Sequence, residues 1–85
     1  MTPDFRLQRR ILETLCALSG LAIAERILID EVAMRFHSAP SADDIRDQIT
    51  LLQQQGFIQS NKGPLGETRW RRTPAGEAAL KDLQA

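Results

Sequence analysis

The sequence has little of the chemistry that small catalytic or metal-binding proteins use: it holds one cysteine, one histidine and one tryptophan among 85 residues. A single cysteine excludes an intramolecular disulfide and a zinc site of several thiolates. The chain also lacks a signal-peptide pattern at its start and any apolar run near the roughly 20 residues of a membrane span. We therefore expect a cytoplasmic protein with no metal, no cofactor and no membrane partner.

No residue pattern predicts an enzyme. His37 stands alone in a predicted connector, without a cysteine or serine at a spacing that would make a catalytic pair. Cys16 lies on or beside the apolar side of the first predicted helix, where a buried, inert thiol is expected. The glycines of residues 63–66 belong to a predicted hairpin turn rather than to a phosphate-binding loop. We expect a binding protein, folded as one domain over residues 1–85.

Acidic and basic residues are equal in number, 11 each, so the formal net charge is zero. Zero net charge disfavours nucleic-acid binding, because DNA-binding domains usually carry a basic patch. The charges are nevertheless unevenly spread. Residues 25–47 hold six acids and three arginines, whereas residues 56–72 hold one lysine, three arginines and a single acid, Glu67. The second segment is therefore the one that suits a polyanion.

The first part of the chain predicts one long helix and one short one. Apolar residues recur at helical spacing over residues 3–18, and Thr2 is the predicted N-cap. The stretch Ile27–Ile29 fits either a short strand or the first turn of a helix. We favour an extended piece there, followed by a helix over residues 31–36 with Asp30 as its N-cap.

The second part predicts a helix, a hairpin and a last helix. The helix spans residues 41–55, because Ser41 can cap it, Asp44 completes a capping box and Gly56 ends it. A period of two then predicts strands at 57–60 and 68–72 on either side of a glycine- and proline-containing turn. A last helix begins after its N-cap, Thr73, with Pro74 at the first helical position.

Two stretches of the sequence resemble winged-helix regulators. The first, "DDIRDQITLLQQQGFIQSN", resembles their recognition helix and the strand that follows it. The second, "TRWRRTPAGEAAL", resembles the last wing strand and the following helix of the MarR and PadR repressor families. The resemblance implies an α+β winged helix-turn-helix fold, with a three-helix core, a two- or three-stranded antiparallel wing and a short C-terminal helix. The chain departs from those families in lacking their ligand-binding or long dimerisation segments.

The same resemblance implies a small DNA-binding protein, a bacterial or phage transcriptional regulator or accessory factor. Its helix 41–55 would enter the major groove of double-stranded DNA, and its hairpin would contact the backbone or the minor groove. Arginine pairs with guanine and glutamine with adenine, whereas basic side chains neutralise phosphates. The predicted DNA-binding residues are Arg46, Thr50, Gln53 and Gln54 on the helix and Lys62, Arg69, Arg71 and Arg72 on the hairpin.

A protein-interaction module without DNA binding is the alternative, because fold does not dictate function. Its contact surface for a basic partner would be the acidic side of helix 41–55, formed by Asp43, Asp44 and Asp47. A homodimer through the first and last helices would suit paired DNA half-sites. Strand alternation predicts that Trp70 and Arg72 lie on the opposite side of the hairpin from Arg69 and Arg71, with Trp70 in the core.

Overall fold

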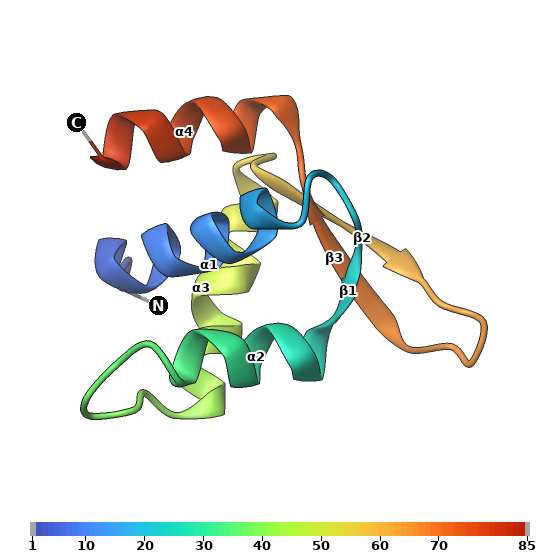
Figure 1. Cartoon of the computed structure of the whole chain (residues 1–85), viewed down its shortest axis with the longest axis horizontal. Helices are drawn as coiled ribbons and strands as arrows, with labels where there is room; N and C mark the ends of the chain where they lie inside the picture. Colours follow the sequence, from blue (N-terminus) through green and yellow to red (C-terminus); the bar gives the residue numbers. More distant parts are fainter. Residues whose placement is uncertain (1, 85) are drawn as a thin grey trace.

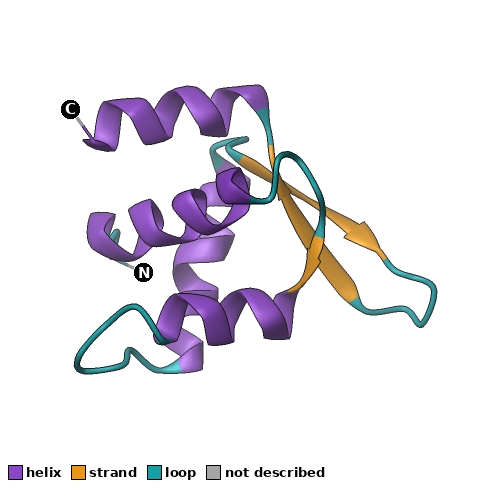
Figure 2. Cartoon of the chain, in the orientation of Figure 1, coloured by secondary structure: helices purple, strands orange, loops and turns teal. Residues whose placement is uncertain are grey.

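The computed structural model describes residues 2–84, which form helices packed on one side of a small antiparallel sheet (Figures 1 and 2). The elements in chain order are α1 (Phe5–Ala17), β1 (Ile23–Ala24), α2 (Glu25–Ala33), α3 (Ala42–Gln54), β2 (Ile58–Lys62), β3 (Thr68–Arg72) and α4 (Pro74–Gln84). The sheet order is β1-β3-β2, so that β3 is central. The predicted α+β class is confirmed. No helix within residues 2–84 has both the length and the apolar character that crossing a membrane requires.

The core lies where α1, α2 and α3 meet the sheet. The side chains buried there come from all these elements: Leu7, Ile11, Leu12, Leu15, Leu28, Ile29, Val32, Ile45, Ile49, Leu52, Ile58 and Trp70, with Leu80 from α4. Trp70 is only 5% exposed, which confirms its predicted place in the core. Its indole Nε1 donates a hydrogen bond to Glu25 Oε1 at 3.1 Å, so the polar edge of the ring is also satisfied.

The start of α1 differs from the prediction. Asp4, not Thr2, is the N-cap, and its Oδ1 accepts hydrogen bonds from the backbone N–H groups of Arg6 and Leu7. The carbonyl of Thr2 instead accepts a hydrogen bond from the side chain of Gln48, on α3. The N-terminal segment is therefore held against α3, and the helix begins only at Phe5.

The region before α2 also differs. The extended piece lies at Ile23–Ala24, earlier than predicted, because these residues pair with β3. Ile27–Ile29 lies inside α2, in agreement with the alternative of a first helical turn. Asp30 is therefore a mid-helix residue and not an N-cap. The N-cap of α2 is Ala24, whose side chain cannot accept a hydrogen bond, so the usual capping signal was missing from the sequence.

The third helix and the hairpin confirm the prediction closely. Ser41 is the N-cap of α3, and its Oγ accepts a hydrogen bond from the backbone N–H of Asp44 at 3.0 Å. Gly56 follows the helix with a φ of 79°, a left-handed conformation that favours glycine. Strand β2 begins one residue later and ends two residues later than predicted, while β3 has the predicted bounds.

The segment Thr73-Pro74-Ala75-Gly76 fixes α4 to the end of the hairpin. The Thr73 hydroxyl accepts a hydrogen bond from Gly76 N and donates one to the carbonyl of Gly56, which confirms Thr73 as the predicted cap. Gly76 is buried, and a Cβ added to it would lie 1.9 Å from the carbonyl oxygen of Phe57. That oxygen also accepts the backbone N–H of Thr73. Only glycine lets the helix approach the backbone of Phe57, the residue before β2, so closely.

We therefore expect Gly76→Ala to destabilise the fold by about 2 kcal/mol, the usual cost of overpacking a tight contact. Alanine is the better helix former by about 1 kcal/mol, so a net loss would show that the clash with Phe57 outweighs propensity. Urea denaturation followed by circular dichroism measures the difference. The control is Ala78→Gly, at an exposed position of the same helix, which should cost only the propensity difference. An alanine variant as stable as the parent would contradict the packing argument.

Candidate nucleic-acid interface

The β2–β3 hairpin extends away from the helices and ends in an exposed loop (Figure 1). Its register pairs Gln59 with Arg71, Ser60 with Trp70 and Asn61 with Arg69. Because successive side chains of a strand point to opposite faces, Arg69 and Arg71 share one face and the buried Trp70 occupies the other. The predicted alternation is confirmed.

Arg72 lies apart from the other predicted site residues. Its Nη1 donates a hydrogen bond to the carbonyl of Cys16 at 3.1 Å, and its Nε lies 3.5 Å from Glu77 Oε2. The side chain is only 23% exposed. Arg72 therefore joins the end of α1 to the start of α4. Burial raises the pKa of the neighbouring Cys16 thiol, an effect that the charge of Arg72 opposes.

Arg69 is held in place by the one acid of the hairpin. Its Nε and Nη2 lie 3.0 and 2.9 Å from Glu67 Oε1, while Glu67 Oε2 accepts the backbone N–H of Leu65. Hydrogen bonding from its own backbone N–H first, and then from Arg69 and Leu65, holds the pKa of Glu67 below its ordinary value. Glu67 thus stays ionised and offsets the charge of Arg69.

Lys62 and Arg71 are the more available cations of the hairpin. Both side chains are exposed. Arg71 contacts the side chain of Gln59 across the strand pair, and Lys62 Nζ lies 3.2 Å from the hydroxyl of Thr68. Neither contact is with an acid, so both positive charges face solvent without neutralisation.

The outer face of α3 carries charges of both signs. Arg46 is flanked by acids, with Nη1 3.4 Å from Asp43 Oδ1 and Nε 3.7 Å from Glu25 Oε2. The Thr50 hydroxyl donates a hydrogen bond to the carbonyl of Arg46 within the same helix. Gln53 and Gln54 are exposed, near the end of α3 where it approaches the hairpin. Of the four predicted helix residues, Arg46 and the two glutamines are exposed and Thr50 is half-buried, but Arg46 is paired with acids.

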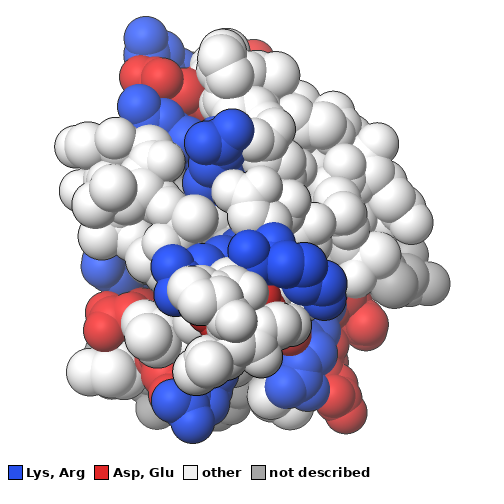
Figure 3. All heavy atoms as spheres, turned by 90° about the vertical axis from the view of Figure 1, so that its right-hand side faces the viewer, with Lys and Arg blue, Asp and Glu red and all other residues white. Residues whose placement is uncertain are grey.

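Figure 3 shows how the charges are arranged on the face that carries the hairpin. Lys and Arg side chains gather around an uncharged projection, and Asp and Glu lie mainly toward the edges of the view. Although the net charge of the whole chain is zero, this face of the molecule is therefore locally basic. Within residues 2–84, no three His, Cys, Asp or Glu side chains lie together in a way that could hold a metal ion.

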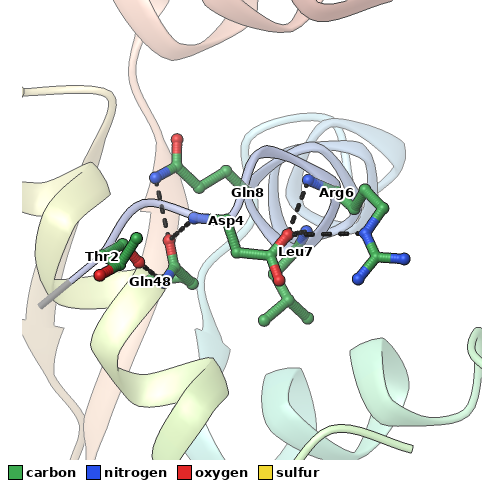
Figure 4. A network of polar contacts seen from close by, with 6 residues as sticks. All are labelled: Thr2, Asp4, Arg6, Leu7, Gln8 and Gln48. Carbon is green, nitrogen blue, oxygen red and sulfur yellow. Dashed lines mark hydrogen bonds and ion pairs between the residues drawn. The ribbon is translucent and has the colours of Figure 1, made fainter. Parts of the chain in front are cut away.

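A buried polar network behind α3 was missed by sequence reasoning (Figure 4). Gln48 is 4% exposed and Gln8, on α1, is 3% exposed. Gln48 Oε1 accepts hydrogen bonds from Gln8 Nε2 at 3.0 Å and from Asp4 N at 2.9 Å, and its Nε2 donates to the Thr2 carbonyl. The only signal in the sequence is a glutamine that falls next to Ile49 on the apolar side of α3.

No family model and no curated protein sequence matches the chain. Two solved structures are similar to it. F93 from STIV, described as a winged-helix DNA-binding protein, has a TM-score of 0.81 and 18% sequence identity, over 98% of this chain and 88% of that one. SSV1 F-93 has a TM-score of 0.73 and 26% identity, over 96% of this chain and 86% of that one.

The chain has the winged-helix fold. In the terms of that fold, α3 is the recognition helix and the β2–β3 hairpin, residues 58–72, is the wing. The narrower resemblance to the MarR and PadR families remains a prediction, since no family model matches. The winged helix places Arg69 and Arg71 on one face of the wing and Lys62, opposite Thr68, on the other face. It leaves Gln53 and Gln54 exposed on the recognition helix. It does not bring Arg72 to that surface.

Proposed function

We propose that this protein binds double-stranded DNA and acts in the cytoplasm as a transcriptional regulator or accessory DNA-binding factor, not as an enzyme. The observation that carries the proposal is the projecting wing with the exposed cations Lys62 and Arg71 and the fixed guanidinium of Arg69. The similarity to F93 from STIV, described as a winged-helix DNA-binding protein, supports it.

The wing supplies most of the affinity under this proposal. Each phosphate that a basic side chain neutralises releases condensed counterions, so the contact is favourable and weakens with salt. Arg69 is already oriented by Glu67, which lowers the entropy lost when it meets a phosphate. Arg71 extends the face that carries Arg69, and Lys62 adds a positive charge on the other face of the hairpin.

The recognition helix supplies a smaller, sequence-dependent contribution. Gln53 and Gln54 can pair with adenine edges, and Thr50 can contact a phosphate or the methyl group of thymine. Arg46 can read guanine only after it leaves Glu25 and Asp43, a cost that reduces the net gain. The acids in the first turn of α3 also repel phosphates, so we propose modest sequence selectivity.

A homodimer on paired half-sites is part of the proposal. Helices α1 and α4 pack side by side, and the wing projects from another side of the molecule (Figure 1). Two copies joined through these helices would leave both wings free for DNA. The spacing of the half-sites would then report the dimer geometry.

A protein partner is the second candidate function. Asp43, Asp44 and Asp47 are all exposed at the start of α3, where they form an acidic surface. A basic protein would bind there without needing the wing. Under this alternative, substitutions on the wing leave binding unchanged and substitutions of the three aspartates abolish it.

The decisive experiment is a titration of labelled random duplex DNA, roughly 20 base pairs or two helical turns long. Fluorescence anisotropy should show binding at about 50 mM salt that weakens steeply by about 200 mM salt. The slope of log affinity against log salt counts the phosphates contacted. Absence of binding at low salt would overturn the proposal and favour the protein partner.

A further inference from the structure

The tip of the wing carries an apolar side chain that phosphate binding does not use. Leu65 is 93% exposed, more than any other large hydrophobic residue within residues 2–84, and the adjoining Pro64 is exposed as well. Both stand at the end of the hairpin that projects farthest from the core (Figure 1). Full exposure of such a residue forgoes the free energy that its burial would give.

The tip is an ordered structure and not a loose loop. A turn is closed by a hydrogen bond from Gly66 N to the Gly63 carbonyl at 3.0 Å, and Gly63 N donates to the Glu67 carbonyl at 2.8 Å. The Glu67 side chain accepts the backbone N–H of Leu65 at 3.0 Å. A Cβ at Gly63 would lie 1.7 Å from Glu67 Oε1, so glycine leaves the space that this carboxylate occupies. These contacts direct Leu65 outward.

Basic side chains surround this apolar tip. Lys62 precedes the turn on β2, and Arg69 and Arg71 follow it on β3. Figure 3 shows an uncharged projection with Lys and Arg side chains above and below it and a few Asp and Glu atoms close to it. An apolar pocket on a protein partner would not require these neighbouring basic side chains. The minor groove of DNA is about 6 Å wide, is lined by phosphates and admits apolar wedges between base steps.

We propose that Leu65 is a wedge that enters the minor groove and partly unstacks one base step, while Lys62, Arg69 and Arg71 hold the flanking phosphates. This inference rests on the proposed DNA binding and deepens it. It assigns the wing tip the role of deforming DNA, with a preference for pyrimidine–purine steps such as TA, which unstack most easily. Glu67 is the positioning residue that sets the direction of the wedge.

The test uses a duplex with 2-aminopurine at a central TA step, because this base becomes more fluorescent when it is unstacked. We expect saturating amounts of the parent protein to raise the fluorescence. Leu65→Ala should bind about tenfold more weakly, keep the same salt slope and lose the fluorescence rise. The control is Leu21→Ala, which removes an exposed leucine in the α1–β1 connection and should match the parent.

The outcomes separate the wedge from DNA binding itself. If the parent binds no duplex at low salt, the proposed function fails and the wedge with it. If the parent binds but the fluorescence stays constant, or if Leu65→Ala matches the parent in both readouts, the wedge is overturned and DNA binding stands. If Leu65→Ala changes only a protein–protein association measured by sedimentation, the tip is a protein contact and the wedge is likewise overturned.

Discussion

Replacing both Arg69 and Arg71 with alanine is expected to weaken binding to duplex DNA about 100-fold at low salt. Each arginine would lose a charge-assisted contact with phosphate of about 1.5 kcal/mol, or roughly tenfold in affinity. The slope of log affinity against log salt should fall by about two, because each lost phosphate contact lowers it by about 0.9. Fluorescence anisotropy over a range of salt concentrations measures both quantities.

The two single variants should differ, because only Arg69 is paired with an acid. Arg69→Ala also leaves the Glu67 carboxylate without its cation, so a negative charge then faces the phosphates. Arg71→Ala removes a contact with Gln59 and exposes no acid. Arg69→Ala is therefore the more damaging change, and adding Glu67→Gln to it should recover part of the affinity.

The matched control for the arginine variants is Arg35→Ala. Arg35 is exposed just beyond the end of α2 that lies away from the wing (Figure 1). Its loss changes the net charge by the same amount as either wing variant. If Arg35→Ala weakened binding as much as Arg71→Ala, total charge and not the wing would control the affinity, and the proposed interface would be wrong.

Local signals were enough to predict most elements of the fold. Ser41 and Thr73 lie next to the helices that they cap, and the capping hydrogen bonds that they accept come from only three residues along the chain. The alternation that buries Trp70 and exposes Arg71 belongs to a single strand. These features depend on neighbours in sequence, and the sequence therefore predicts them.

The predictions that were wrong depend on residues far apart in the chain. The strand at Ile23–Ala24 exists because it pairs with β3, and two residues are too few to show a period. Thr2 lies two residues before Asp4, the N-cap of α1, and its carbonyl accepts a hydrogen bond from Gln48, 46 residues away. No propensity or spacing within either segment contains that information.

The same distinction applies to the candidate site. Composition and spacing placed Lys62, Arg69 and Arg71 on one hairpin, where the structure has them. Two other predicted site residues are paired with acids of other elements: Glu25, on α2, reaches Arg46 on α3, and Glu77, on α4, reaches Arg72 on β3. The sequence shows how many basic residues the chain has, but it does not show which of them are paired with acids.

Gln48→Leu is expected to destabilise the protein by about 3 kcal/mol. The leucine cannot accept the hydrogen bond from Gln8, which would leave a buried amide unsatisfied at about 1–3 kcal/mol, and the bonds to Asp4 N and the Thr2 carbonyl are lost as well. In a domain of this size each kcal/mol lowers Tm by about 4–8 °C, so thermal denaturation by circular dichroism should show a fall of more than about 10 °C.

The double variant Gln8→Leu/Gln48→Leu separates this mechanism from a simple loss of bonds. Replacing both buried amides with apolar groups of similar size removes the unsatisfied partner, so the double variant should be more stable than Gln48→Leu alone. Gln54→Leu, on the exposed face of the same helix, should stay within about 0.5 kcal/mol of the parent. If the double variant were less stable than the single one by the full cost of a second substitution, the two amides would act independently. The coupling of α3 to α1 through them would then be disproved.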